Sequence, residues 1–437
     1  MRGAFLRPIA GGFLVFAVAA GAQDVTSPGV RIGLRYDPGS KPGVIVLPVS
    51  GPSGDSIRAI LERDFDYSDR LNPIPLSPED GSILAATTPG GGAPSLNHAV
   101  FAKVGAAGVI QITITTRGLH VALHDVARAA VANVREFPVP KGEFSREWRQ
   151  AIHGVSDVIL EWISGERGAS QTRLAFIRSH VVYVIDADGV GETALPMIGP
   201  ALSPAWNPRG TSIAYNTFGP ESRIVIHDLR SGKTREFGSQ RNTTNATPIF
   251  TPDGKSILYA LSTEAGTDLF LYPLDGEAFP RRVTVGRGSV NWGPSFHPDG
   301  RRLAFSSDRT GTPQVYIIDA DGTNLDWFTE FDFGDQNDRG SPDWSPDGRQ
   351  IAFQSRIDGR YQIFTMSLRD RQPRQLTSEG ENEDPSWAPD GRHLVFASTR
   401  TGVKQLWVLD VESARLRQLT QVGGSRVPSW SPRLTAR

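Results

Sequence analysis

Beyond residue 172 the chain alternates short apolar runs with polar turns. One unit shows the order clearly: residues 302–306 and 314–319 are rich in Leu, Ile, Val and aromatic residues, and the polar residues 308–312 lie between them. Alternation with a period of two, bounded by Gly and Asp, predicts strands joined by hairpins. A turn at residues 321–322 and a short outer strand end the unit, and four strands per unit are typical of a β-propeller blade.

A Pro-x-aromatic-x-Pro motif recurs six times along this part of the chain. Its first prolines are 43 to 48 residues apart, a period that indicates a propeller or another repeat array. Proline fixes its own φ, and the Asp-Gly that follows most copies closes a tight turn. The motif therefore predicts a very short strand whose aromatic side chain packs against a neighbouring blade. The six first prolines are Pro204, Pro248, Pro294, Pro342, Pro385 and Pro428.

The strand pairs and the motifs are out of step by one at the two ends of the repeat region. The first strand pair, residues 173–177 with 181–185, has no motif before it, and the last motif, at 428–432, has no strand pair after it. We therefore expect the C-terminal strand to complete the first blade. This predicts a closed six-bladed propeller over residues 172–437 that leaves no long open edge.

Residues 23–168 lack the repeat. Apolar residues at helical spacing from Trp148 to Trp162, followed by Gly165, predict a helix with a glycine C-cap. Strands mixed with helices predict a small α/β domain, preceded by an extended N-terminal segment. The predicted strands of this domain are residues 44–49, 108–115, 119–125 and 129–135.

Residues 1–22 have the pattern of a signal peptide. Arg2 and Arg7 form a basic region, and the apolar run at 9–20 is too short to span a bilayer. The small residues 20–22 favour cleavage before Gln23, so we expect an exported, periplasmic protein.

The charge balance and the motifs argue against several classes of function. The 46 basic and 47 acidic side chains nearly cancel, which gives no general attraction to nucleic acid or to an anionic membrane. The chain has no cysteine, its eight histidines form no metal-binding pair at helical spacing, and neither a G-x-S-x-G elbow nor a phosphate-binding loop occurs. We therefore predict no catalytic residues, no metal site and no cofactor.

The crossovers that lead into the motifs offer a candidate binding surface. In an antiparallel meander they lie on the face opposite the tight Asp-Gly turns, and their lengths and composition vary. The crossovers of blades five and six are acidic and the others are basic or rich in amides, which suits a polar peptide or protein partner. The alternative is that these charges simply face water. The crossovers are residues 241–247, 287–293, 335–341, 379–384 and 423–427.

The repeat resembles that of the TolB family, the periplasmic component of the Tol-Pal envelope system. The resemblance extends outside the propeller. Residues 153–161 with 165–168 and 172–176 are similar to the segment that joins the two domains of that family. Residues 60–71 resemble its first helix and the following turn, where this chain has Ser68-Asp69 in place of the common Ser-Gly.

The resemblance implies a non-enzymatic adaptor that supports outer-membrane integrity and constriction at cell division. Its propeller mouth would bind the lipoprotein Pal, its N-terminal segment at 26–36 would bind TolA through Val30, Arg31 and Ile32, and bacteriocins would be imported at the same mouth. Such a protein would act as a monomer within its complex, without nucleic acid and without direct membrane insertion. The mouth residues implied are Thr244, Asn245, Thr247, Asn291, Trp292, Asp338, Glu383 and Arg426.

Two alternatives belong to other classes. A secreted propeller hydrolase of the prolyl-oligopeptidase kind needs an α/β-hydrolase domain with Ser, Asp and His in chain order, and neither part of this sequence shows one. A propeller of the envelope that binds carbohydrate is the third hypothesis.

Overall fold

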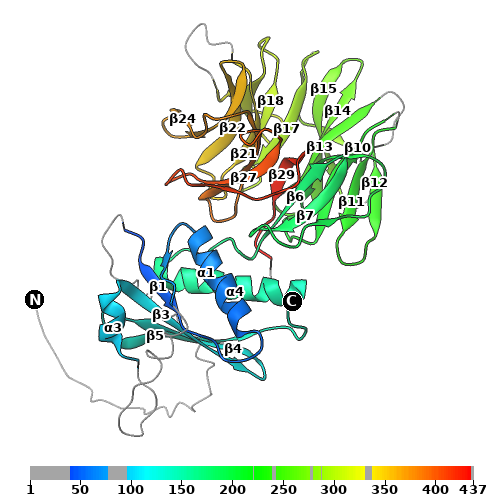
Figure 1. Cartoon of the computed structure of the whole chain (residues 1–437). Helices are drawn as coiled ribbons and strands as arrows, with labels where there is room; N and C mark the ends of the chain where they lie inside the picture. Colours follow the sequence, from blue (N-terminus) through cyan, green and yellow to red (C-terminus); the bar gives the residue numbers. More distant parts are fainter. Residues whose placement is uncertain are drawn as a thin grey trace, which may run out of the picture.

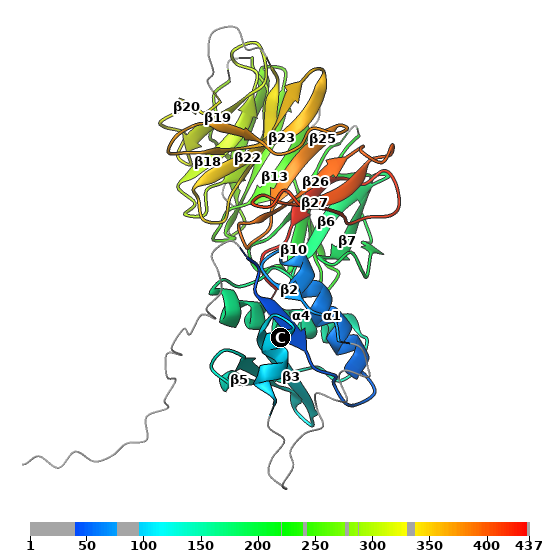
Figure 2. The ribbon, with the colours of Figure 1, turned by 60° about the vertical axis from the view of Figure 1, so that its left-hand side comes forward.

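A computed structural model describes two bodies, a β-propeller and a smaller α/β domain, and Figures 1 and 2 show the propeller above the α/β domain. The predicted signal peptide and Val30, Arg31 and Ile32 lie outside the described residues. Within the described part, no helix combines the length and the apolar character needed to cross a membrane. The described residues are 40–76, 96–219, 221–238, 243–275, 279–286, 288–329 and 337–434.

The α/β domain is a five-stranded sheet in the order β2-β1-β3-β4-β5, in which β1 is parallel to both of its neighbours. Helices α1 and α4 pack on one face of the sheet, and α3 packs on the other. Ser145 caps the start of helix α4, because its Oγ accepts from Trp148 N, and Gly165 with φ 80° caps the end, which confirms the predicted helix and its cap. The elements are β1 (Gly43–Val46), α1 (Gly54–Tyr67), β2 (Asn72–Pro73), α3 (His98–Lys103), β3 (Ala106–Thr115), β4 (Gly118–Asp125), β5 (Ala130–Pro138) and α4 (Arg146–Ser164).

Six four-stranded antiparallel sheets form the blades of the propeller, which confirms the predicted fold. In each blade the strand that carries the Pro-x-aromatic motif lies innermost, next to the channel. Blade 1 consists of β29 (Arg426–Trp430), β6 (Arg173–Arg178), β7 (Val181–Asp186) and β8 (Thr193–Ala194); blade 2 of β9 (Ala201–Trp206), β10 (Ser212–Thr217), β11 (Ile224–Asp228) and β12 (Thr234–Phe237); blade 3 of β13 (Thr244–Phe250), β14 (Ser256–Thr263), β15 (Gly266–Pro273) and β16 (Arg281–Arg282).

The remaining three blades follow the same plan in chain order. Blade 4 consists of β17 (Asn291–Phe296), β18 (Arg302–Ser307), β19 (Gln314–Asp319) and β20 (Asp326–Trp327); blade 5 of β21 (Arg339–Trp344), β22 (Gln350–Ile357), β23 (Arg360–Ser367) and β24 (Pro373–Gln375); blade 6 of β25 (Asn382–Trp387), β26 (His393–Ser398), β27 (Gln405–Asp410) and β28 (Leu416–Gln418).

The C-terminal strand closes the ring. Strand β29 pairs antiparallel with β6, with Trp430 opposite Leu174, as the offset between motifs and strand pairs predicts. The indole Nε1 of Trp430 donates to Thr172 Oγ1 at 2.8 Å, and Ser431 Oγ accepts from Arg173 N at 2.9 Å. Pairing of the two ends removes the open edge that a linear array of sheets would expose.

The aromatic residues of the motifs pack between blades, as predicted. Trp344 lies in one apolar cluster with Val315 of blade 4, and Trp387 lies in one with Ile363 of blade 5. Trp430 likewise packs against Val408 of blade 6. Each tryptophan is at most 8% exposed, so these side chains bind each blade to the one before it.

Candidate functional site at the propeller mouth

The inner strands of the six blades line a central cavity of about 310 Å³. The residue before each motif proline has a φ between 44° and 57°, and the strand pairing shifts register at that point. Each inner strand therefore carries a β-bulge, a device that re-aims side chains and is frequent near functional sites. Only one of these residues is a glycine, so the other five hold a strained conformation, which points to a functional constraint on the channel wall. The six residues are Ser203, Thr247, Gly293, Ser341, Asp384 and Val427.

Short polar side chains connect each inner strand to the next around the channel. At the bulges, Thr247 Oγ1 accepts from Gly293 N at 3.2 Å, and Ser341 Oγ donates to Asp384 Oδ1 at 3.2 Å. Three residues after the bulge, the main-chain N–H groups of three motif tryptophans donate to the preceding blade: Trp344 N to Ser295 Oγ (3.0 Å), Trp387 N to Asp343 Oδ2 (2.7 Å) and Trp430 N to Ser386 Oγ (3.1 Å). These bonds make the wall of the channel rigid.

Two recessed carboxyl groups, Asp343 and Asp384, line this cavity. Both side chains keep some exposure to the channel, yet they lie deep among protein atoms. Burial raises the pKa of Asp343 to about 6, against the hydrogen bonds that it accepts from Trp387 N and from Ser295. Burial, together with the neighbouring Glu383, also raises the pKa of Asp384 to about 6. At neutral pH the two groups give one side of the channel a negative charge.

The α/β domain covers the other face of the propeller. Its partners there lie in or next to the tight turns: His393, just after a Pro-Asp-Gly turn, contacts Asp69; Asp188 of an Asp-Gly turn pairs with Arg149; and Arg415 between β27 and β28 pairs with Asp66. Because loops alternate between the two faces of a meander, the crossovers and the bulged ends of the inner strands lie on the opposite, uncovered face. Among the described residues, the α/β domain therefore does not cover the candidate binding mouth.

Four of the predicted mouth residues lie at or near the cavity. Thr247 and Trp292 line it directly. Thr244 is exposed at the start of β13, and Arg426 is half-buried at the start of β29. These residues come from three blades, and the ring brings them to one face.

Asn245 and Asn291 are both 0% exposed, so their side chains are not displayed at the surface. The Asn245 amide donates to the carbonyl of Ser222 at 2.8 Å, and the Asn291 amide donates to the carbonyl of Thr267 at 2.8 Å. Both side chains thus bind an inner strand to the preceding blade.

The two predicted acidic residues are both in ion pairs. Asp338 pairs with Arg356 at 3.5 Å, and Glu383 pairs with Lys404. These pairs neutralise part of the acidic side that the crossover sequences predict. The recessed Asp343 and Asp384 carry negative charge without a basic partner in direct contact among the described residues.

Sequence reasoning missed Asp343 and Ser341 as channel-lining groups. Asp343 stands between the proline and the tryptophan of its motif, where the other copies carry Ala, Ile or Ser. An aspartate at this otherwise uncharged position of the repeat was the sequence feature that could have indicated a channel-lining carboxylate. The bulge at Ser341 arises from the pairing of β21 with β22, which no single residue of the sequence signals.

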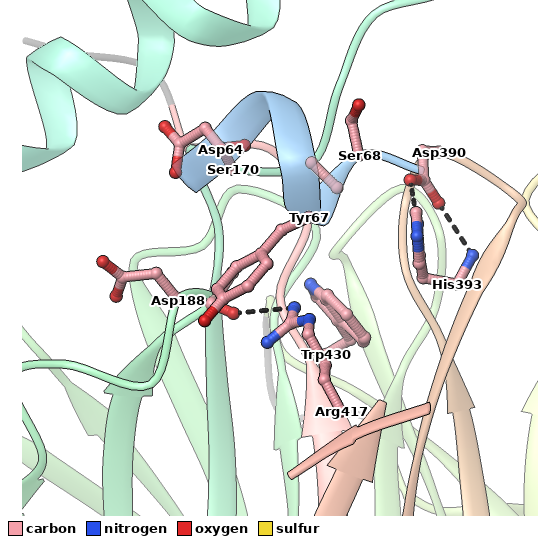
Figure 3. Close-up of a pocket in the computed structure, with 11 residues that line it drawn as sticks. Asp64, Tyr67, Ser68, Ser170, Asp188, Asp390, His393, Arg417 and Trp430 are labelled. Carbon is pink, nitrogen blue, oxygen red and sulfur yellow. Dashed lines mark hydrogen bonds and ion pairs between the residues drawn. The ribbon is translucent and has the colours of Figure 1, made fainter. Parts of the chain in front are cut away.

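Sequence reasoning also missed a charged cluster between the two domains, shown in Figure 3. Residues from α1 and the turn after it meet the turns of blades 1 and 6 around a small cavity of about 30 Å³, enough for a bound water. The guanidinium carbon of Arg417 lies 4.3 Å from the ring centroid of Tyr67. Nη2 of the same arginine donates to the carbonyl of Ala187 at 3.0 Å. Arg415 pairs with Asp66 at 2.6 Å.

Histidines at this interface lie beside carboxylates. Burial disfavours the charged form of His393, but Asp390 and Asp69 outweigh this effect and raise the pKa of His393 to about 9. The pKa of Asp69 is lowered to about 2, because its bonds to His393 and Lys41 outweigh its burial. Below pH 9 the interface therefore holds a protonated imidazole between two carboxylates.

Two groups at this interface have donor atoms close enough together for a metal ion: Asp69, His393 and Asp410, and His153, Asp186 and Asp188. In both groups arginine already balances the carboxylates. Arg392 donates to Asp410 at 2.5 Å, and Arg149 pairs with Asp188 at 2.6 Å. We interpret both groups as ion-pair networks that hold the two domains together.

Comparisons with known proteins agree with this architecture. A family model described as the TolB beta propeller domain matches residues 160–434. The Tol-Pal system protein TolB of Bordetella pertussis is 32% identical over 183 residues, which are 40% of this chain and 41% of that protein, and the protein of the same name from Bordetella parapertussis matches equally well. The chain thus spans about two fifths of the length of the curated relatives it matches.

Solved structures extend the likeness over most of the chain. The crystal structure of TolB from Acinetobacter baumannii superposes with a TM-score of 0.75 at 26% identity and covers 90% of this chain and 98% of that one. Hydrazine synthase from Kuenenia stuttgartiensis, with a TM-score of 0.52 at 13% identity over 69% of this chain and 52% of that chain, shares the fold alone. From the matched propeller and this superposition, the chain belongs to the TolB β-propeller family.

Proposed function

We propose that this protein is a non-enzymatic periplasmic adaptor of the Tol-Pal system that binds the lipoprotein Pal at the mouth of its propeller. The observation that carries the proposal is the ring of six bulges around a cavity of about 310 Å³, on the face opposite the α/β domain. Family membership supports the assignment to the Tol-Pal system.

The channel suits a polar segment of a partner protein. Hydrogen bonds between blades fix the wall before the partner arrives, so little ordering cost remains at binding. Asp343 and Asp384 favour N–H donors or a basic side chain that enters the channel, and Trp292 offers an aromatic contact surface at its entrance. Bacteriocins would use the same mouth.

The N-terminal segment supplies the second proposed contact. Residues 26–36, with Val30, Arg31 and Ile32, would bind TolA after the signal peptide is removed before Gln23. One adaptor would then connect an outer-membrane lipoprotein to an inner-membrane protein, as support of outer-membrane integrity and constriction requires.

The adaptor is favoured over the two alternative functions by the chemistry of the channel. The described residues that line it include serine and aspartate but no histidine or lysine that would activate a hydroxyl group. A carbohydrate-binding propeller remains the competing hypothesis, and it predicts retention of a glycan rather than of a lipoprotein.

The test is capture of partners from envelope extract by the mature chain, residues 23–437, with mass spectrometry of the retained proteins. We expect Pal and TolA to be retained. Reversal of the charge at Glu383, which is paired at the mouth, should reduce retention of Pal only. The matched control is Glu236→Lys, because Glu236 is also a paired glutamate but lies on outer strand β12.

Asp384 is unsuitable for charge reversal. It accepts a hydrogen bond from Ser341, and its main-chain N–H donates to Gln354 Oε1 at 2.9 Å, so a lysine there would disturb the channel wall itself. Retention of neither Pal nor TolA by the wild-type chain would overturn the proposal.

A further inference from the structure

An arginine of blade 4 occupies a seat built from two aromatic rings and an asparagine. The guanidinium carbon of Arg309 lies 5.4 Å from the ring centroid of Phe305 and 4.9 Å from that of Tyr316, which face each other on β18 and β19. Its Nη2 donates to Asn291 Oδ1 at 2.8 Å, and its Nε donates to Ser307 Oγ at 3.0 Å. The cation is thus held by ring faces and by two hydrogen bonds.

Two further blades hold a guanidinium in the same surroundings. In blade 6 the arginine also follows its phenylalanine by four residues, whereas in blade 1 it follows by two. In each, a guanidinium lies over the cross-strand aromatic pair and donates to the side chain of the residue three positions before the motif proline. In blade 6, Arg400 lies over Phe396 (5.5 Å) and Trp407 (4.9 Å) and donates to Asn382 Oδ1 (3.1 Å); in blade 1, Arg178 lies over Phe176 (5.2 Å) and Tyr183 (4.8 Å) and donates to Ser425 Oγ (3.0 Å).

Blade 3 has the seat without the arginine. Tyr259 and Phe270 form the cross-strand pair, with ring centroids 6.5 Å apart, and Asn245 takes the place of Asn291. Thr263 follows Tyr259 by four residues, as Arg309 follows Phe305. Asn245 is 0% exposed, and its Oδ1 has no hydrogen-bond partner among the residues that the structure describes. A buried carbonyl oxygen without a donor is costly and calls for an explanation.

A pocket of about 480 Å³ lies at this point. Asn245 and the ring pair of blade 3 line it, and Phe237 and Tyr272, stacked at 4.7 Å, extend its aromatic wall. Phe279 lies at its rim with 91% of its surface exposed. None of its described lining residues is basic, and none of them lines the central channel.

We propose that this pocket binds the guanidinium group of an arginine side chain from a partner protein. The chain's own blades identify the ligand, because three of them hold a guanidinium over the equivalent pair of aromatic rings. The aromatic faces attract the cation, and its planar N–H groups supply the donor that Asn245 Oδ1 lacks. Leu261 stands where blade 4 has Ser307, so the incoming group keeps one of the two side-chain hydrogen bonds. The site lies outside the channel, and the inference goes beyond the proposed function.

The test uses Nα-acetyl-arginine amide as the probe, titrated into the mature protein and followed by ligand-observed NMR. The neutral isostere Nα-acetyl-citrulline amide is expected to bind at least tenfold more weakly. Absence of binding by the arginine probe, or equal binding by the citrulline probe, would overturn the proposal.

A variant that supplies the arginine missing from blade 3 tests the location of the site. Thr263→Arg places an arginine where blades 4 and 6 carry theirs, so binding of the probe should be lost and the thermal midpoint should rise. Ala265→Arg adds the same charge two residues further along the exposed hairpin and should leave probe binding unchanged.

A second variant covers the case in which the introduced arginine turns outward. Phe270→Leu removes one face of the seat and should weaken probe binding at least tenfold, with the circular dichroism of the propeller retained. Undiminished binding in this folded variant contradicts the assignment.

Discussion

Nε2 of His393 lies 3.5 Å from Oδ2 of Asp69, although 324 residues separate the two in the chain. The contact joins blade 6 to the turn after α1, and Nδ1 of the same imidazole lies 2.6 Å from Asp390. Asp69 has a φ of 55°, the left-handed conformation that glycine adopts most easily and that aspartate tolerates. The turn after α1 can therefore carry an aspartate, which supplies a carboxylate to the interface.

The stability of the protein should fall as the pH rises from about 6.5 to about 9. The folded pKa of His393, about 9, lies above its unfolded value, so the protonated imidazole contributes stability that is complete below pH 6.5 and is lost as the pH passes 9. The pKa of His153, which faces Asp64 and Asp188, is also raised and has the same sign. Thermal midpoints across this range should fall less steeply for His393→Gln than for the wild type. Equal slopes for both proteins would contradict the role given to His393.

Asp69→Gly should destabilise the contact between the domains. Glycine suits the turn, but the variant loses the ion pairs of Asp69 with Lys41, at 3.0 Å, and with Arg415, at 3.3 Å, as well as its contact with His393. We expect a loss of about 1–3 kcal/mol in the free energy of unfolding, measured by urea titration. A more stable variant would show that backbone strain at Asp69 outweighs its ion pairs.

The channel carboxylates give a pH dependence in a lower range. The folded pKa of Asp384, about 6, is raised above its usual 3.8, so the folded state holds the proton more tightly. This contribution to stability is greatest below pH 3.8 and is lost as the pH rises through 6, and Asp343 acts in the same direction. Asp384→Asn keeps an acceptor for Ser341 and should reduce the decline in thermal midpoint between pH 4 and pH 7. If the thermal midpoint of the variant declines as steeply as that of the wild type, the raised pKa assigned to Asp384 is contradicted.

The closing strand should carry a large share of the stability of the propeller. Trp430 is 8% exposed and donates to Thr172, so Trp430→Ala should cost about 3–5 kcal/mol and lower the thermal midpoint. Deletion of residues 427–437 should abolish the cooperative transition of the propeller. A wild-type melting curve for the deletion variant would contradict closure by β29.

Much of the fold was predictable because its determinants are local and repeated. Proline, Asp-Gly and period-two alternation specify each blade, and one orphan strand and one orphan motif at opposite ends specify the closure. Helix α4 was predictable for the same reason, since its apolar spacing and Gly165 lie within one segment. Repetition turns a weak local signal into a strong one.

The candidate site was less predictable because tertiary contacts decide it. Asn245 and Thr244 are neighbours in sequence, yet one is buried and the other exposed, according to which side of β13 each occupies. The ion pair of Glu383 with Lys404 joins strand β25 to the loop just before β27. The empty seat in blade 3 becomes visible only when the blades are compared in three dimensions, because a threonine at position 263 is not unusual in a hairpin.

The central claim is that the mouth of the propeller binds Pal, and calorimetric titration of the mature chain with the soluble domain of Pal from the same organism tests it most directly. We predict one-to-one binding that Trp292→Ala weakens at least tenfold, and that the matched variant Trp327→Ala, on outer strand β20 of the same blade, leaves unchanged. The account is contradicted if the wild-type chain does not bind Pal, or if Trp292→Ala binds it with undiminished affinity while folded.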